Sequence, residues 1–324
     1  MASDIGNRKK RLKAIVIAII VLVGVYFGYG DEVITILENY NIDTTQVQEY
    51  LDEFDQNKLY MHMINVGQGD SFLFVQGDET ALVDCGPQSA GDDVVNYLDK
   101  LGIEELDLVI ITHPHEDHMG GLYQVLTNKK VDRIVMPKVK QGLVVSQWYL
   151  KDIRQIKTSR IPVTYPNLND VFEIGSSKFK LVGMMTSREV KDDNINNYSL
   201  VFKVSFGNMD VLMTGDAEKE LEEKLVKSGA DIDAEILKIA HHGSKTSSTD
   251  EFLDAVNPDY AFISAKKGND FKHPHKDTMD KLEERRIVLF RTDELGTVIA
   301  TIGRNNVTFD KKTCDYLNGS ELCT

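Results

Sequence analysis

The feature that most constrains this chain is a cluster of three histidines and an aspartate within the six residues from His113 to His118. The cluster directly follows the apolar run 106–111 and precedes Gly120 and Gly121. Four such side chains in one turn cannot be buried in an apolar core without a large desolvation cost. Divalent ions offset that cost, since borderline metals such as zinc take imidazole and carboxylate ligands together. The pattern His-x-His-x-Asp-His at a strand end therefore predicts a metal site.

Two further histidine patches support this prediction. Seven of the eight histidines lie at 113–118, 241–242 and 273–275. The patch at 241–242 again follows an apolar run, and the run 211–214 leads to Asp216. Because side chains at the carboxyl ends of neighbouring strands converge on one rim, we expect Asp216 and the first two patches to meet.

The hydrophobic pattern predicts two sheets covered by helices rather than one doubly wound sheet. Helical spacing predicts helices at 92–101, after Gly121 and at 217–227. Short apolar or alternating runs predict strands at 59–66, 71–75, 80–84, 106–111, 133–136, 178–182, 199–206, 210–214, 235–239, 260–264, 288–291 and 297–302.

The N-terminus is predicted to be a membrane anchor. Residues 8–13 are basic, and 14–30 are seventeen uncharged, mostly aliphatic residues, at the short end for a membrane span. The basic flank predicts that 1–13 stay cytoplasmic and that the rest is exported, so the protein is expected at the cell membrane with a single pass and an extracytoplasmic domain. A cleaved signal peptide is the alternative, but no small-x-small cleavage site follows. The predicted organisation is therefore tail 1–13, anchor 14–30, acidic stalk 31–57, domain 58–303 and C-terminal tail 304–324.

Charge and cysteine content narrow the partners. A formal net charge of −14 argues against a wide DNA-binding face, although metal ions can supply local positive charge for a nucleic-acid substrate. Cys85 is predicted to be a small buried side chain. Cys314 and Cys323 can pair if the tail lies outside the cell.

Several motifs place the chain near a known family. In order and spacing, residues 59–303 resemble the metallo-β-lactamase superfamily and, more closely, the C-terminal metallo-β-lactamase-like domain of ComEC-type DNA-uptake proteins. The matching stretches are 65–71, 82–86, 113–121, 196–201, 214–216, 241–244, 269–274 and 291–296.

The resemblance implies an αββα sandwich with two divalent ions, Zn or Mn. It implies one ion on His113 and His115, the other on Asp117 and His118, and Asp216 as the bridge. Either His241 or His242 can fill the last ligand position. Because side chains alternate along a strand, we favour His242 as the ligand and expect His241 to support it from outside the ligand shell. Asp84 matches an early aspartate that orients ligands, and Asp70 lies in the first matching stretch.

The chain departs from many superfamily members at one position. They supply another histidine to the first metal just before the strand leading to the bridging aspartate, whereas residues 193–199 contain none. Asn196 is the nearest match, as in the ComEC-like branch. An amide is a poorer zinc ligand than imidazole, so the first site is expected to be weak or to prefer manganese.

The predicted chemistry is hydrolysis by a metal-activated water, whose pKa falls to roughly 7 on zinc. Asp117 can double as proton acceptor, and His273 is a candidate to hold a substrate phosphate or to protonate the leaving group; its alternative is a plain loop histidine. The predicted substrate contacts are Ser244, Lys245, Ser264 and Asn269.

The leading functional prediction is a membrane-tethered phosphodiesterase or nuclease acting on a nucleic acid or an envelope polymer. With a single predicted span, the chain cannot itself form the channel of ComEC-type proteins. A phosphocholine-esterase-like envelope hydrolase, a lactonase or β-lactamase-type hydrolase, and a non-catalytic partner of a DNA-uptake complex remain as alternatives.

Overall fold

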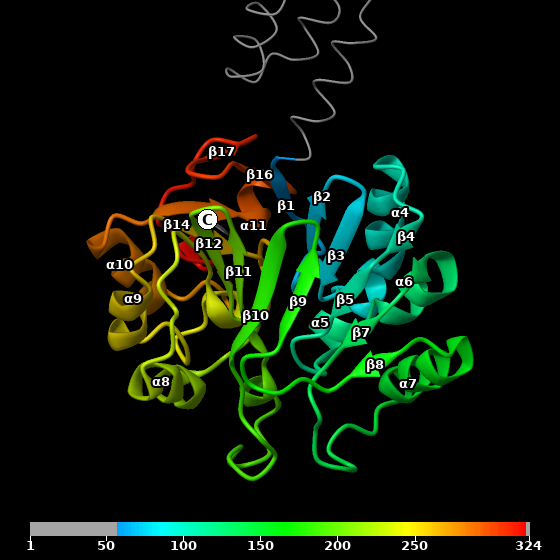
Figure 1. The fold of residues 1–324 in the computed structure, drawn as a ribbon. Helices are drawn as coiled ribbons and strands as arrows, with labels where there is room; N and C mark the ends of the chain where they lie inside the picture. The colour runs from blue at the N-terminus through cyan, green and yellow to red at the C-terminus, as the bar shows by residue number, and fades with distance from the viewer. Residues whose placement is uncertain (1–56, 322–324) are drawn as a thin grey trace, which may run out of the picture. The chain divides into compact units, whose positions relative to one another are not determined.

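Two sheets pack face to face between two layers of helices in the computed structural model, which describes residues 57–321 (Figure 1). The first sheet has the order β17-β16-β1-β2-β3-β5-β7-β8 and the second β15-β14-β13-β12-β11-β10-β9. Strands β4 and β6 form a separate pair. The prediction of two helix-covered sheets is therefore confirmed.

The strands are mostly short. The first sheet contains β1 (Leu59–Met63), β2 (Phe72–Gln76), β3 (Glu79–Val83), β5 (Leu108–Ile110), β7 (Ile134–Val135), β8 (Val163–Thr164), β16 (Val298–Ile302) and β17 (Val307–Phe309). The second contains β9 (Val171–Ile174), β10 (Ser177–Gly183), β11 (Val201–Phe206), β12 (Met209–Met213), β13 (Ile236–Lys238), β14 (Tyr260–Ile263) and β15 (Val288–Arg291). The small pair is β4 (Glu105–Leu106) and β6 (Lys130–Val131).

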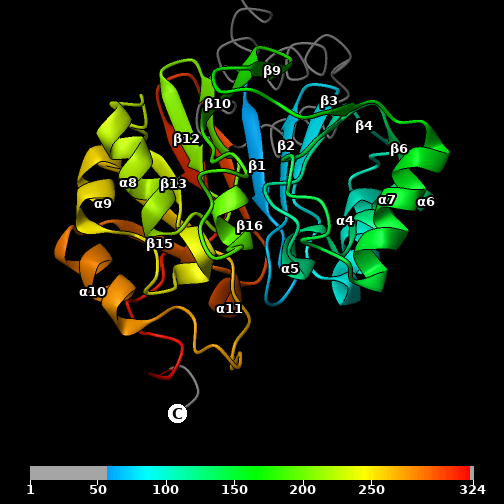
Figure 2. The same cartoon turned by 90° about the horizontal axis from the view of Figure 1, so that it is seen from below.

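The helices divide between the outer faces of the two sheets. Figure 2 shows one group beyond the first sheet and another beyond the second. The first group is α4 (Gly91–Lys100), α6 (Leu122–Asn128) and α7 (Gln147–Ser159); the second is α8 (Lys219–Ser228), α9 (Asp250–Val256) and α10 (Lys276–Glu284). Short helical turns lie in the loops: η1 (Gln88–Ala90), α5 (Glu116–Met119), η2 (Ile195–Tyr198), η3 (Ala240–Gly243) and α11 (Thr292–Leu295). Of these six helices on the outer faces, α7, α9 and α10 were not predicted.

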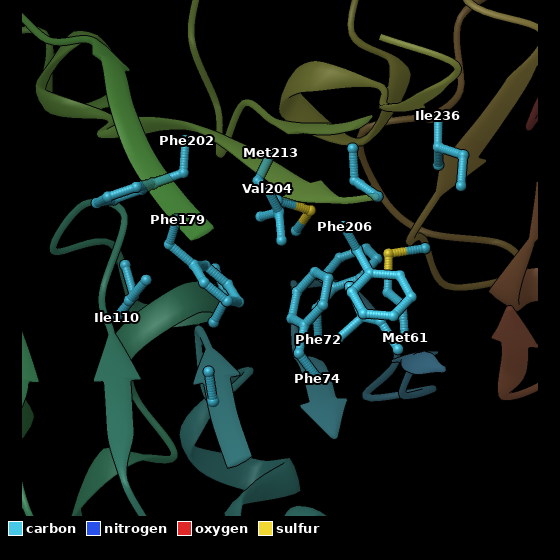
Figure 3. Close-up of a cluster of buried hydrophobic side chains, with 14 of the residues drawn as sticks. Met61, Phe72, Phe74, Ile110, Phe179, Phe202, Val204, Phe206, Met213 and Ile236 are labelled. Atoms are coloured by element: carbon cyan, nitrogen blue, oxygen red, sulfur yellow. The ribbon is translucent and has the colours of Figure 1, made fainter. Parts of the chain in front are cut away.

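Aromatic side chains from both sheets fill the space between them (Figure 3). Phe74 of β2 meets Phe179 of β10 edge to face, with ring centroids 5.2 Å apart. Both rings are completely buried. Such edge-to-face pairs are stabilising beyond the area they bury, so this contact helps to lock the two sheets together.

Parallel pairing brings the functional loops to one edge of each sheet. β3, β5 and β7 are parallel in the first sheet, and β12, β13, β14 and β15 are parallel in the second. The carboxyl ends of parallel strands lie at the same edge, where ligands collect in such sheets. The histidine patches and Asp216 all follow strands of these two parallel sets.

The chain after Arg304 packs on the domain. β17 pairs with β16, and the Cys314 amide donates to the Leu289 carbonyl at 2.8 Å. Arg291, fully buried, donates from Nη1 to the Leu317 carbonyl. The segment predicted to be a tail thus adds strand β17 to the first sheet and forms hydrogen bonds with Leu289 and Arg291. The predicted partner of Cys314, Cys323, lies outside the described residues.

No helix within residues 57–321 is long and apolar enough to cross a membrane. The predicted anchor at 14–30 and the predicted stalk, except for its last residue, lie outside the described part of the chain.

Candidate metal centre

Loops at the ends of four strands bring the predicted ligands together. His113, His115, Asp117 and His118 follow β5, the last two in the single turn of α5. Asp216 follows β12, and His242 lies in η3 after β13. Asp84 follows β3. The expectation that these segments share one rim is met, because their side chains form three overlapping clusters in which ligand atoms lie within 4.8 Å of one another.

The first cluster, which we name the His113 group, consists of His113, His115 and Asp216. His113 Nε2 lies 3.0 Å from His115 Nδ1 and 3.9 Å from Asp216 Oδ2. Two imidazole nitrogens this close repel each other unless a proton or a cation lies between them. The donor set therefore suits a cation that accepts nitrogen ligands.

The second cluster, the Asp117 group, consists of Asp117, His118, Asp216 and His242. His242 Nε2 lies 3.1 Å from Asp117 Oδ2, and His118 Nε2 lies 3.2 Å from Asp216 Oδ1. His118 Nε2 and Asp216 Oδ1 are buried yet have no hydrogen-bond partner within the described residues. Since buried polar atoms are normally satisfied, this pair also fits a bound cation. Asp216 belongs to both groups, as a bridging carboxylate would.

Hydrogen bonds behind the rings aim their Nε2 atoms inward. His118 Nδ1 donates to Asp84 Oδ2 at 2.8 Å, and His242 Nδ1 donates to the Ser264 carbonyl at 2.8 Å. Thr112 Oγ1 donates to Asp84 Oδ2 at 2.7 Å and can therefore accept from His113 Nδ1 at 3.1 Å. Metal-binding histidines are typically held by such outer partners, which fix the ring orientation. Asp84 serves two of the three rings.

The centre carries an excess of carboxylates. Asp70, Asp84 and Asp216 are all buried there. Burial lowers the pKa of His242, but Asp216 and Asp70 outweigh it and raise that pKa to about 10. Burial likewise lowers the pKa of His118, yet Asp216 and the other carboxylates raise it well above its usual value. Such a field favours cations, and divalent ions would neutralise it.

One buried lysine, Lys238, balances part of this charge. Its Nζ lies 2.7 Å from Asp70 Oδ2 and donates to the Ile239 carbonyl at 2.8 Å. Asp70 in turn lies beneath two ligand histidines, 3.4 Å from His242 Nδ1 and 3.8 Å from His118 Nδ1. Sequence reasoning missed Lys238, although its place three residues before the His241–His242 pair was a usable signal.

A second missed residue, Glu218, anchors the edge of the centre. Its Oε1 lies 3.2 Å from His241 Nδ1 and accepts from Asn196 Nδ2 at 2.9 Å. Burial raises its pKa, but the hydrogen bonds from His241, Asn196 and Asn194 prevail and lower it to about 2. His241 Nε2 lies 3.9 Å from Asp216 Oδ2. Asn196 Oδ1 is buried without a hydrogen-bond partner in the described chain. The hydrogen bond from Asn196 Nδ2 to Glu218 connects this amide to the centre.

The backbone at the second patch departs from a strand. His241 and His242 both have left-handed φ, 51° and 53°, which non-glycine residues rarely adopt. Alternation along a strand therefore does not govern which ring faces inward, and both Nε2 atoms lie within 4 Å of Asp216. Such strained positions cluster at functional sites.

Gly69 allows a close approach of two loops at the centre. Its φ is 142°, and a Cβ there would lie 2.3 Å from the Asp117 carbonyl. The neighbouring Asp70 amide donates to that same carbonyl at 3.0 Å. A side chain at position 69 would therefore displace the loop that carries the Asp117 group.

The remaining predicted contacts lie at the rim, but several of them use their side chains within the fold. Ser264 Oγ donates to the Gly69 carbonyl at 2.6 Å, and Ser244 Oγ pairs with Thr246 Oγ1 at 3.1 Å. Asn269 Nδ2 donates to the His273 carbonyl at 2.7 Å, which shapes the loop. Lys245 is exposed.

His273 is buried rather than a plain loop histidine. Its ring centroid lies 5.4 Å from that of His241 and 6.2 Å from that of His242. Burial lowers its pKa to about 3, so the ring is neutral at ordinary pH. Gln68 Nε2 lies 3.4 Å from its Nδ1 and can donate to it, which leaves Nε2 as the protonated nitrogen.

Comparison with known proteins agrees with this geometry. The "Metallo-beta-lactamase superfamily" profile matches residues 64–266. The chain belongs to the metallo-β-lactamase superfamily. This is a family of metal-dependent hydrolases, and the fold and the cluster of possible ligands agree with that assignment.

The relatives in this superfamily include competence proteins. The chain is 34% identical to "ComE operon protein 3" of Bacillus subtilis over 73% of its own length and 32% of that protein. It is 28% identical to "Competence protein ComA" of Neisseria gonorrhoeae, over 78% and 33% respectively. The more distant "Endoribonuclease YSH1" of Gibberella zeae is 22% identical, over 50% and 21%. The chain thus spans about a third of the length of the competence relatives.

The fold is shared with solved structures. The diiron β-hydroxylase CmlA of Streptomyces venezuelae superposes with a TM-score of 0.52 at 16% identity, over 76% of this chain and 54% of that one. A metallo-β-lactamase-like architecture was implied by the sequence motifs and is confirmed.

Proposed function

We propose that this protein is a metal-dependent phosphodiesterase whose two divalent ions, Zn or Mn, are held by the His113 group and the Asp117 group. The observation that carries the proposal is the bridge: Asp216 contributes to both groups, and the buried ring nitrogens converge on it. Two ions at such a site supply Lewis acidity toward a phosphoryl oxygen and lower the pKa of a bound water to near neutrality.

The side chains of the centre have distinct roles in this proposal. Asp117 is the solvent-facing carboxylate, since its side chain is 29% exposed whereas that of Asp216 is 2% exposed. It is therefore placed to accept a proton from the attacking water. The neutral His273, with Nε2 protonated, donates a hydrogen bond to a substrate phosphate oxygen. His241 takes the position of the histidine that is missing near Asn196 in this proposal, because Glu218 contacts both residues and His241 Nε2 lies 3.9 Å from Asp216 Oδ2.

A phosphodiester is favoured over the other ester classes by the relatives. "Endoribonuclease YSH1" bears the name of an enzyme that cleaves a phosphodiester backbone, and "Competence protein ComA" is named for competence. Two divalent ions held by this carboxylate-rich donor set would supply the positive charge that an anionic reacting group requires.

The decisive experiment measures metal and turnover together in the full-length chain. Bound metal is counted by mass spectrometry, and hydrolysis of bis-p-nitrophenyl phosphate is followed with Zn²⁺ or Mn²⁺. We expect Asp216→Asn to lose the greater part of both bound ions and turnover, since it weakens both groups. The control Asp78→Asn removes an exposed carboxylate from the opposite end of β3 and should retain both.

Other outcomes would identify the competing functions. Equal metal content in Asp216→Asn and in the parent would refute the bridge. Turnover of a lactone or a β-lactam without turnover of a phosphodiester would favour the lactonase or β-lactamase type, and release of phosphocholine would favour an envelope esterase. Absence of turnover on every substrate, with metal bound, would favour a non-catalytic partner.

We further propose that residues 14–30 anchor the protein in the cell membrane and hold the domain outside the cytoplasm. The basic residues 8–13 before an uncharged run support this orientation. Protease digestion of intact cells tests it: the domain should be cleaved from outside while an epitope placed before residue 8 stays protected.

A further inference from the structure

The loop between β14 and α10, residues 264–275, carries a feature that the proposed chemistry does not use. Phe271 in this loop is 63% exposed although it lies beside the buried His273. Single exposed hydrophobic side chains are common on protein surfaces, so Phe271 is informative through its position beside the candidate metal centre rather than through its exposure alone.

Phe271 is the outer member of a series of rings that leads to the metal centre. Its ring is stacked on His273 with centroids 5.6 Å apart and an interplanar angle of 22°. His273 is tilted by 30° against His242 at 6.2 Å. The outer face of Phe271 is thus held parallel to the ring beneath it, within about 12 Å of His242. One side of this exposed ring therefore faces His273, and the rest of it is open to solvent.

The same loop is positively charged on an acidic protein. Lys266, Lys267 and Lys272 are exposed, and none lies within ion-pair distance of a carboxylate among residues 57–321; Asp270 is the one acidic residue in the loop. Lys266 and Lys267 also line a hollow of about 710 Å³, together with Asp93 and Asp293, and this hollow reaches Gln68, the residue that contacts His273. On a chain with a net charge of −14, the loop that carries His273 therefore bears a local excess of positive charge.

We infer that this loop is a subsite for single-stranded nucleic acid, in which a base stacks on Phe271 and the neighbouring lysines contact the phosphates. The inference rests on the proposed phosphodiesterase function and names its substrate class. Stacking on an exposed ring within a basic groove is how single strands are held without sequence preference. A base in a duplex is not free to stack in this way, so the single strand is specified.

The charge of the loop decides against the other polymer considered for this centre. An aromatic ring can also bind a quaternary ammonium such as choline, through its negative face. Lys272, the next residue after Phe271, and Lys266 and Lys267 of the same loop repel such a cation, whereas they attract a phosphate backbone. The loop therefore fits a nucleobase with its flanking phosphates better than a phosphocholine group.

The test measures binding by the full-length chain in EDTA, where the strand is not cleaved. The probes are a fluorescent oligothymidylate of about twelve nucleotides, within the site sizes of single-strand binders, and the same strand with abasic positions. We expect Phe271→Leu to raise the Kd for oligothymidylate about fivefold or more, to leave the Kd for the abasic strand unchanged, and Phe271→Trp to restore binding. Tyr165→Leu, which removes an exposed aromatic ring elsewhere, is the matched control and should have no effect.

The lysines are tested by salt dependence. Replacing Lys266, Lys267 and Lys272 with glutamine should reduce the slope of log Kd against log salt by about two, since each single-strand phosphate contact contributes about 0.7. If Phe271→Leu weakens binding of oligothymidylate and of the abasic strand equally, or weakens neither, the proposed subsite is refuted. Tighter binding of a phosphocholine polymer than of oligothymidylate would also refute it.

The outcomes separate this inference from the proposed function. Phe271-dependent binding without any hydrolysis supports the subsite and refutes the phosphodiesterase. Hydrolysis of oligothymidylate with the same KM in Phe271→Leu and the parent refutes the subsite alone.

Discussion

Replacing Lys238 with methionine tests whether the buried Lys238–Asp70 pair supports the metal centre. Both side chains are almost fully buried, and Lys238 Nζ lies 2.7 Å from Asp70 Oδ2. Burial raises the pKa of Asp70, but Lys238 and then His242 outweigh it and keep the carboxylate ionised. Removal of one partner of a buried ion pair costs about 3–5 kcal/mol, because the other charge is left without compensation. His242 and His118, at 3.4 Å and 3.8 Å, compensate part of it, so we expect a loss of about 3 kcal/mol.

The assay is urea unfolding at pH 7 in EDTA, which prevents bound metal from adding to the stability of the folded state. The variants are Lys238→Met, Asp70→Asn and the double variant. If the reasoning holds, the double variant is more stable than the sum of the two single losses implies, because removing both charges leaves no buried charge without a partner. Lys276→Met is the matched control: its pair with Asp280 has a 2.5 Å contact but is exposed, and we expect little change. A loss of less than about 1 kcal/mol in Lys238→Met, or strictly additive single losses, would refute the argument.

Three further predictions concern other parts of the molecule. Burial raises the pKa of Asp152 to about 7 from an ordinary 3.8. The free-energy cost of burying the ionised carboxylate is therefore absent below pH 3.8, grows up to pH 7 and then stays constant. The shift corresponds to at most about 4 kcal/mol, and Asp152→Asn should therefore stabilise the protein by about 2 kcal/mol at pH 8 and by almost nothing at pH 3.5; a gain that does not depend on pH in denaturant titrations would contradict this. Phe74→Ala should destabilise the fold by about 3–5 kcal/mol because it opens the contact between the sheets, whereas Phe271→Ala, at the surface, should leave the melting temperature nearly unchanged; equal shifts in the two would contradict the packing. Glu218→Gln should weaken metal binding about 10–100-fold through His241, with Glu223→Gln on the exposed face of α8 as control; unchanged affinity by competition with a chelating dye would remove Glu218 from the centre.

The sequence alone identified the local part of the centre. His113, His115, Asp117 and His118 lie within one turn, so their proximity follows from spacing without any knowledge of the fold. The alternating runs around 59–84 and the helix at 92–101 were predictable for the same reason, since neighbouring residues set their periodicity. The convergence of Asp216 with this turn was predictable from a general rule on the carboxyl ends of strands.

Short and irregular elements were not predictable in this way. Helix α9 has only seven residues, and its buried Phe252, Leu253 and Val256 make a pattern too short to distinguish from a loop. The histidine pair at 241–242 was interpreted by strand alternation, but the chain leaves the strand at Lys238 and turns with left-handed φ. Local backbone strain of this kind is imposed by surrounding contacts, which a single sequence does not display.

What the sequence determined by itself is therefore the chemistry of the donors and the superfamily to which they belong. Only the tertiary structure decided that Lys238 neutralises Asp70, that Glu218 links Asn196 to His241, and that Phe271 lies stacked outside His273. These contacts join residues that are distant in the chain or that lie on turns without regular spacing. Their geometry depends on how two sheets pack, and that packing is a property of the whole core rather than of any one stretch.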